Sequence, residues 1–122
     1  MAINNNAPIY LQIADALMDD ILAGRYRADS RMPSVREQAA NCQVNANTVL
    51  RAFEQLERNG IIYNKRGLGY FVSAEAPAII KEQRRRDFYS GELNYFFGRL
   101  KQLEVSLESL ADEYRNYLSS PK

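Results

Sequence analysis

The side chains best suited to a chemical task are hydrogen-bond donors and cations that lie between residues 34 and 67. Asn47 and Arg51 fall on one side of a predicted helix, and Thr48 flanks that side. Amide, hydroxyl and guanidinium groups match the hydrogen-bonding edges of adenine and guanine in the major groove of DNA. Lys65 and Arg66 add two adjacent positive charges, which suit phosphate oxygens. The chemistry that this pattern favours is recognition of a nucleic acid.

Covalent catalysis and transition-metal chemistry lack their usual residues in this sequence. Its 122 residues include no histidine and a single cysteine, Cys42, so neither a Ser-His nor a Cys-His pair can form. The same shortage argues against a cluster of metal-binding side chains. Tyrosine and carboxylate side chains are present, but no spacing brings them together as a nucleophile and its base. We therefore expect no enzymatic activity, no metal site and no cofactor.

Charge is distributed unevenly along a sequence whose formal net charge is only +1. Residues 31–69 contain six basic and three acidic side chains and so carry a net charge of +3, whereas residues 1–30 carry −2. A basic segment is where a polyanion binds, although a solvated basic surface would give the same count. The arrangement of the side chains must decide between these two interpretations.

Helices that could position these residues have recognisable start and stop signals. Apolar residues at helical spacing predict a first helix over 9–22, which Gly24 ends. Ser34 and Glu37 match a capping box, in which each residue hydrogen-bonds the backbone of the other. A short second helix over about 34–41 is therefore predicted to begin at this serine.

The third predicted helix begins at Asn45, a favourable N-cap, and runs to about Asn59 before Gly60. Two β-prone runs, 61–65 and 70–72, then flank a basic turn that contains two glycines and predict a hairpin. Three helices followed by a hairpin form the layout of a winged helix-turn-helix domain. The apolar stripe that packs the third helix inward consists of Val49, Ala52, Phe53 and Leu56.

The remaining sequence predicts two more helices, one over about 78–89 and a longer one that reaches residue 118, with a break at Ser90 and Gly91. Hydrophobic residues in the longer helix alternate at spacings of three and four, an a/d pattern that requires a partner helix. We predict that this seam joins two copies of the chain. It consists of Leu93, Phe96, Leu100, Leu103, Leu107, Leu110 and Tyr114, and Tyr117 continues the spacing.

The predicted fold class is mainly α with a small β-hairpin. A winged helix-turn-helix domain is expected over 1–75 and a two-helix dimerisation tail over 76–122, so a chain ending at Val72 should remain folded as a monomer. Within the tail, the basic run Arg84–Arg86 suits either phosphates that flank a DNA site or acidic side chains across a dimer. We leave the role of this run open.

Four separated motifs resemble the DNA-binding domain of GntR-type bacterial repressors over roughly residues 8–73. The short tail and the sequence Asn-Ala-Asn-Thr-Val are similar to the YtrA-type branch of that family, whose tail serves dimerisation. The resemblance implies a homodimeric repressor, and two half-sites would give a dimer the discrimination that one helix lacks. We therefore expect a pseudo-palindromic operator. The motifs occupy Pro33–Ala40, Val44–Val49, Leu56–Ile62 and Arg66–Val72.

The predicted DNA-binding residues come from the starts of the second and third helices and from the hairpin tip. Arg36 matches an arginine that contacts a base or phosphate in the family that the chain resembles, and Ser34 can cap its helix and still reach a phosphate. Structural roles compete: Arg36 could pair with the adjacent glutamate, Arg51 could pair with Glu54 or Gln55, and the polar residues before it could complete the helix N-terminus. The basic tip could also serve only solubility. The full set is Ser34, Arg36, Asn45, Asn47, Thr48, Arg51, Lys65, Arg66 and Gly67.

A protein-interaction module without DNA binding is the alternative function. Salt dependence separates the two functions, because DNA affinity falls steeply with salt and an apolar groove contact does not. No apolar run approaches the roughly 18 residues of a transmembrane helix, and the first residues lack a secretory pattern. A cytoplasmic protein without membrane contacts is therefore expected, and no residue is assigned to a small-molecule effector.

Overall fold

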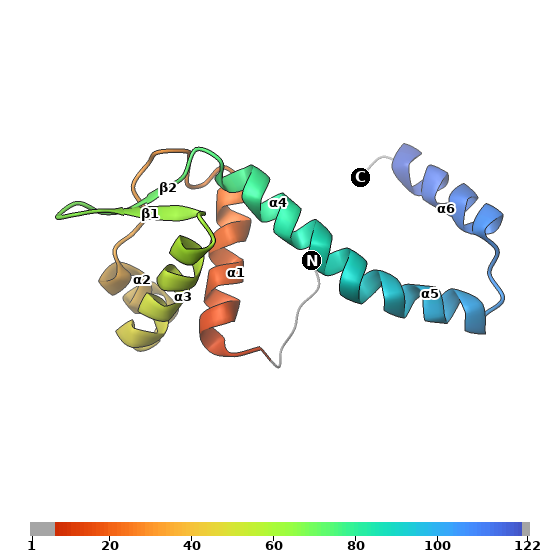
Figure 1. Ribbon diagram of the computed structural model, residues 1–122, viewed down its shortest axis with the longest axis horizontal. Coiled ribbons are helices and arrows are strands. Elements are labelled where there is room, and N and C mark those ends of the chain that lie inside the picture. The colour runs from red at the N-terminus through yellow and green to blue at the C-terminus, as the bar shows by residue number, and fades with distance from the viewer. Residues whose placement is uncertain (1–6, 121–122) are drawn as a thin grey trace. The chain divides into compact units, whose positions relative to one another are not determined.

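The computed structural model describes residues 7–120 and is mainly helical with one small antiparallel hairpin (Figure 1). The order of helices and strands confirms the predicted winged helix-turn-helix fold class. Within the described residues, no helix combines the length and the apolar character needed to cross a membrane. The elements are α1 (Ile9–Leu22), α2 (Val35–Cys42), α3 (Ala46–Arg58), β1 (Ile62–Lys65), β2 (Gly69–Val72), α4 (Ala76–Asp87), a π-helical segment (Phe88–Glu92), α5 (Leu93–Gln102) and α6 (Leu107–Ser119).

The chain forms two compact units, of which the first ends at Gln83 and the second begins at Arg84. Every buried hydrophobic residue of the described part of the chain lies in the first unit, and the last of them is Ile80. Among the described residues of the second unit, all side chains are exposed or only half-buried. The first unit therefore has a hydrophobic core of its own, whereas the second unit alone encloses none.

The helix-turn-helix part of the first unit is defined by hydrogen bonds at its caps. The Glu37 N–H donates to Ser34 Oγ at 3.0 Å and the Ser34 N–H donates to Glu37 Oε1 at 2.8 Å, which confirms the capping box at the start of α2. Gln43 adopts a left-handed conformation (φ 56°), and the Val44 N–H donates to Ala39 O at 3.1 Å. These contacts end α2 and turn the chain directly into the N-cap of α3 at Asn45.

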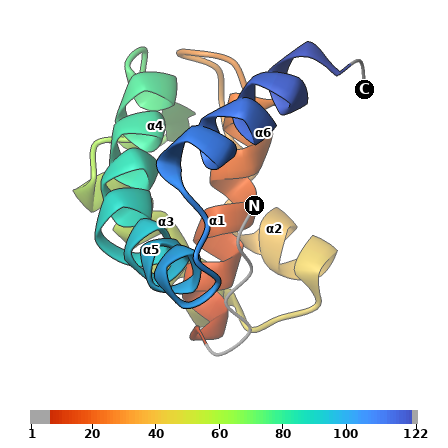
Figure 2. The same ribbon diagram turned by 90° about the vertical axis from the view of Figure 1, so that its right-hand side faces the viewer.

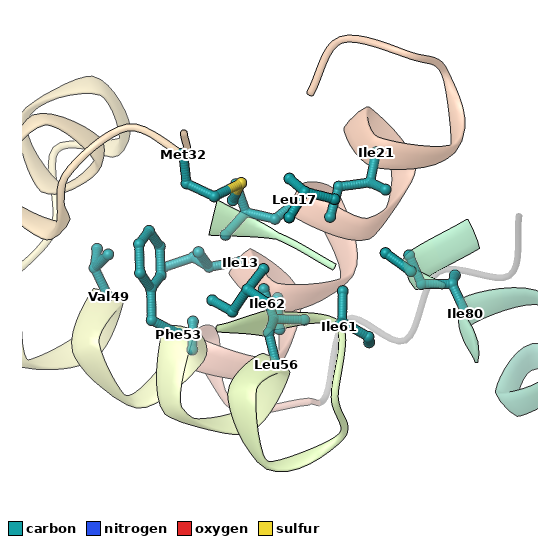
Figure 3. Close-up of a cluster of buried hydrophobic side chains, with 14 of the residues drawn as sticks. Ile13, Leu17, Ile21, Met32, Val49, Phe53, Leu56, Ile61, Ile62 and Ile80 are labelled. Carbon is teal, nitrogen blue, oxygen red and sulfur yellow. The ribbon is translucent and has the colours of Figure 1, made fainter. Parts of the chain in front are cut away.

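The core of the first unit lies between α1, α3 and the hairpin (Figure 3). Phe53 of α3 is the largest of its fully buried side chains and packs edge-to-face against Tyr70 of β2, with ring centroids 5.1 Å apart. Figure 3 shows Ile80 of α4 on the same side of the cluster as Ile21 and Ile61. The core therefore extends past the hairpin into the first turns of α4. Its buried members include the predicted stripe Val49, Ala52, Phe53 and Leu56.

The contribution of α4 to the core bears on the expectation for a shortened chain. Ala76 and Ile80 are both fully buried, so a chain ending at Val72 would lack two core residues, and we expect it to be less stable than a chain that includes α4. α4 also begins at Ala76, two residues earlier than predicted, because proline is tolerated in the first turn of a helix and Pro77 does not delay its start.

The hairpin has an additional neighbour that the sequence analysis did not predict. β1 and β2 pair in antiparallel register, with Ile62 opposite Val72 and Lys65 opposite Gly69. Residues 29–32 run along β2 through three backbone hydrogen bonds of 2.7 to 3.0 Å and a bridge between Arg31 and Phe71. Local sequence patterns do not predict this pairing, because it joins segments about forty residues apart in the sequence.

The predicted long helix of the tail is wrong, because the chain bends between Leu103 and Ser106 (Figure 2). Glu104 adopts a left-handed conformation (φ 55°), and the Val105 N–H donates to Leu100 O at 3.0 Å, which closes α5 as a Schellman motif. Ser106 then starts α6 by accepting a hydrogen bond from the Ser109 N–H. The break expected at residues 90 and 91 is instead a π-helical turn.

Candidate nucleic-acid interface

Ser34 and Arg36 lie at the start of α2. The neighbouring Glu37 takes part in the cap of this helix. Hydrogen bonds from the backbone N–H and the side chain of Ser34 lower the pKa of the Glu37 carboxyl below its usual value. That carboxylate caps the helix through its Oε1, which accepts a hydrogen bond from the Ser34 N–H. The Arg36 side chain is exposed, as a residue that contacts DNA must be.

The start of α3 places its polar residues outward while the opposite side is buried. Asn45 is the N-cap, and its Oδ1 accepts a hydrogen bond from the Asn47 N–H at 2.7 Å. The Asn47 side chain is exposed and Thr48 is half-buried, whereas the next residue, Val49, is fully buried. The capping role falls to Asn45 alone, so the side chain of Asn47 projects from the first turn without a capping role.

Arg51 has a partner that the sequence analysis did not consider. Its guanidinium carbon lies 4.1 Å from the centroid of the Tyr10 ring, which comes from the first turn of α1. Gln55, one of its two expected partners, instead accepts a hydrogen bond from Arg58 at 2.7 Å. A cation over an aromatic face is attracted by the negative charge of the ring face. Tyr10 therefore orients Arg51 at the surface of α3.

The hairpin forms a wing, and the ammonium group of its Lys65 lies over two aromatic rings. Lys65 Nζ lies 4.5 Å from the Phe71 centroid and 5.9 Å from that of Tyr63, and the two rings stack on each other. The Tyr63 hydroxyl donates to Asp29 Oδ1 at 3.0 Å, and partial burial together with this bond raises the pKa of that hydroxyl. The Lys65 charge is thus fixed on one face of the wing.

The remaining residues predicted to bind DNA lie at the tip of the wing. Gly67 has φ +79°, a conformation that favours glycine, and the Leu68 N–H donates to Lys65 O at 2.8 Å across the turn. Arg66 is exposed at this turn. The predicted DNA-binding residues therefore occupy three exposed places in one compact unit: the start of α2, the start and outer side of α3, and the wing tip.

Three aromatic residues beneath these cations were missed by the sequence analysis. Tyr63 and Phe71 could have been found, because the period of two along β1 places Tyr63 on the same face as Lys65 and the hairpin register adds Phe71. Tyr10 gave no such signal, because its contact with Arg51 joins two helices that are distant in sequence.

The predicted dimerisation residues lie on two separate helices rather than on one seam. The set Leu93, Phe96 and Leu100 belongs to α5, Leu103 lies in the bend, and the set Leu107, Leu110 and Tyr114 belongs to α6. Phe96 is 42% exposed and Leu107 is 78% exposed. Large apolar side chains on both helices of the second unit therefore face solvent in the single chain.

The fold and the three exposed places define the first unit as a winged helix-turn-helix domain of the DNA-binding class. A sequence profile of the bacterial regulatory proteins of the gntR family matches residues 9–72. This match covers the whole helix-turn-helix and the wing. The chain belongs to the GntR family and is a DNA-binding transcriptional regulator.

Individual relatives agree with this assignment. The chain is 35% identical over 101 residues to the HTH-type transcriptional repressor YtrA of Bacillus subtilis (strain 168), a match that covers 83% of this chain and 72% of the relative. A crystal structure from Bacteroides thetaiotaomicron, described as a transcriptional regulator of the GntR family, matches with a TM-score of 0.82 and 43% identity over 91% of this chain and 96% of that one. The crystal structure of AraR(DBD) in complex with operator ORR3 matches with a TM-score of 0.54 and 25% identity, over 60% and 88% of the two chains. The resemblance to YtrA-type members is thereby confirmed.

Proposed function

We propose that the chain is a homodimeric repressor that binds a pseudo-palindromic DNA operator through its first unit and dimerises through its tail. The observation that carries this proposal is the placement of cations and amides at the exposed ends of α2, α3 and the wing. The relative named YtrA is a repressor, and AraR(DBD) was crystallised with an operator, which supports the same activity here. For these roles we place the boundary between the two units at Gln83 and Arg84, later than the predicted residue 75, because Ala76 and Ile80 belong to the core of the first unit.

Each part of the interface has a role that follows from its chemistry. Asn47, Thr48 and Arg51 lie where α3 would enter the major groove, and their donors and acceptors suit base edges. The groups at the start of α2, at the N-cap of α3 and on the wing suit backbone phosphates and the minor groove, because they are cations, hydroxyls or amides. The second set consists of Ser34, Arg36, Asn45, Lys65, Arg66 and Gly67.

Dimerisation is argued from the apolar surface of the second unit. Burying apolar area is the main source of stability for a folded segment, and the described part of this unit buries no side chain by itself. An identical surface on a second copy would cover it, because a twofold interface joins the same patch on both subunits. The exposed large residues available for this contact are Phe88, Tyr89, Tyr95, Phe96, Phe97, Leu103, Val105, Leu107, Tyr114, Tyr117 and Leu118.

The same proposal places the protein in the cytoplasm and gives it no catalytic role. A repressor acts where the chromosome is, and the family and the relatives compared above are described as regulators of transcription. The residues that the structure brings together at the three exposed places are suited to holding DNA, and no chemical step is assigned to them.

Selection of bound fragments from random DNA by the purified full-length chain tests the proposal directly. We expect enrichment of an inverted repeat whose half-sites are separated by about one helical turn, roughly 10 base pairs. Sedimentation of the protein with the enriched fragment should show two chains per duplex. Enrichment of a single unrepeated half-site would contradict the dimer, and the absence of any enrichment at low salt would contradict sequence-specific binding.

Arg51→Ala and Lys65→Ala are expected to weaken DNA binding in different ways. Arg51→Ala should cost about 1 to 3 kcal/mol on the selected operator and relax the preference at one position in each half-site, because it removes a base contact. Lys65→Ala should weaken binding to operator and random DNA to a similar degree, because it removes a phosphate contact. Titration of both variants against both duplexes measures the contrast. Equal losses for Arg51→Ala on the two duplexes would count against base reading.

A further inference from the structure

Arg31 lies in the extended segment that pairs with the wing, and this pairing fixes the direction of its side chain. The Met32 N–H donates to Tyr70 O at 2.8 Å and the Val72 N–H donates to Ser30 O at 3.0 Å, on either side of the bridge between Arg31 and Phe71. Met32 is buried in the core, and successive side chains in an extended strand point to opposite faces. Arg31 is accordingly directed away from the core and is exposed.

The Arg31 guanidinium is close to the wing because a glycine stands opposite it. A Cβ atom at Gly69 would lie 3.5 Å from Arg31 Nε and 3.9 Å from Arg31 Nη2. Gly69 also has φ +102°, a conformation that L-residues rarely adopt. The glycine therefore allows the wing to turn and leaves the guanidinium in contact range of the wing backbone, two residues from the tip at Gly67.

Arg31 also precedes Ser34, the N-cap of α2, by only three residues along the chain. Its positive charge adds to the Ser34 hydrogen bonds in lowering the pKa of the Glu37 carboxyl in the first turn of that helix. The Glu37 carboxylate is engaged by the Ser34 N–H. Arg31 is therefore exposed between two places already assigned to DNA backbone contact: the start of α2, three residues further along the chain, and the wing, which its guanidinium approaches at Gly69.

We propose that Arg31 is a further DNA-contacting residue, whose guanidinium binds a backbone phosphate between those held by the start of α2 and by the wing. This inference rests on the proposed function and adds a residue that the sequence analysis did not select. A guanidinium is suited to this task because its forked N–H groups match two oxygens of one phosphate. Such a contact adds affinity on every sequence and does not read bases.

Arg31→Ala in the full-length protein tests the assignment through the salt dependence of binding. Loss of one phosphate contact per copy, and so two per dimer, should make the slope of log K against log salt shallower by about 1.8. Binding to the operator and to random DNA should weaken alike, by about tenfold or more near physiological salt. Arg31→Lys should keep most of the wild-type slope, because it retains the charge.

Arg25→Ala is the matched control, because it removes the same charge from the same unit. Arg25 lies just beyond α1 and pairs with Asp20 at 3.7 Å, so its loss should leave the slope unchanged. If Arg31→Ala is poorly folded by thermal unfolding, Arg31→Gln takes its place, since it keeps a long polar side chain. A slope for Arg31→Ala equal to that of Arg25→Ala, with a reduced slope for Lys65→Ala, would overturn the inference and leave the proposed interface intact. Wild-type binding by the Arg31, Arg51 and Lys65 variants together would overturn the interface itself.

Discussion

Phe53→Ala is expected to lower the free energy of unfolding of the first unit by about 3 to 5 kcal/mol. Phe53 is fully buried, lies between α1 and the hairpin in the core cluster, and packs against the Tyr70 ring of β2. Its removal deletes the largest buried side chain and leaves a cavity that well-packed neighbours cannot fill. Chemical denaturation followed by circular dichroism measures the loss.

Leu68→Ala provides the control for this substitution. Leu68 is 59% exposed at the wing tip, so its truncation should change the free energy of unfolding by less than about 0.5 kcal/mol. A Phe53→Ala protein as stable as the Leu68→Ala protein would mean that α3 does not pack against the hairpin as described. The position of the wing beside α3 would then need another explanation.

A chain ending at Gln83 is expected to be a folded monomer whose operator affinity is lower by about 10² to 10⁴ fold. All of the buried residues in the described part of the chain precede this end point, so the first unit keeps its core. This chain lacks the second unit, which we propose holds two copies together. Without it, the second half-site is no longer bound by a unit already attached to the same DNA. Analytical ultracentrifugation and operator titration measure the two effects.

The shortened chain also separates the roles of the two units. Cooperative thermal unfolding should persist, and binding to a single half-site should match that of one unit within the full-length dimer. A chain ending at Gln83 that remains dimeric would assign dimerisation to the first unit. An unfolded product would show that the first unit depends on α5 and α6, contrary to the distribution of its buried residues.

The helix-turn-helix and the wing were predictable because their signals are local. The Ser34–Glu37 capping box, the Asn45 cap and the glycine after α3 each act within a few residues, and the structure uses all three. The residues placed at the interface followed from the same reasoning, because a helix with one apolar stripe must present its other side outward. The predicted positions of these elements therefore needed little correction.

The tail was mispredicted because its stop signal is unusual for a helix end. The heptad spacing continues through Leu103 and Leu107, while the left-handed position that ends α5 is occupied by Glu104 rather than by glycine. Ser106 was the available signal, as an N-cap after a β-branched residue. Contacts between distant segments, such as Tyr10 with Arg51 and residues 29–32 with β2, depend on tertiary packing and left no mark on local sequence.

The pairing of residues 29–32 with β2 joins the wing to the stretch of chain that leads into α2. The two surfaces proposed to contact DNA thus share one hydrogen-bonded framework and cannot be displaced independently without breaking it. Because the two surfaces are held rigidly relative to each other, the DNA duplex must adapt its groove width and curvature to fit them. On the proposed operator we therefore expect base pairs that no side chain touches to contribute to binding through their stiffness, so that the spacer between the half-sites carries sequence information of its own.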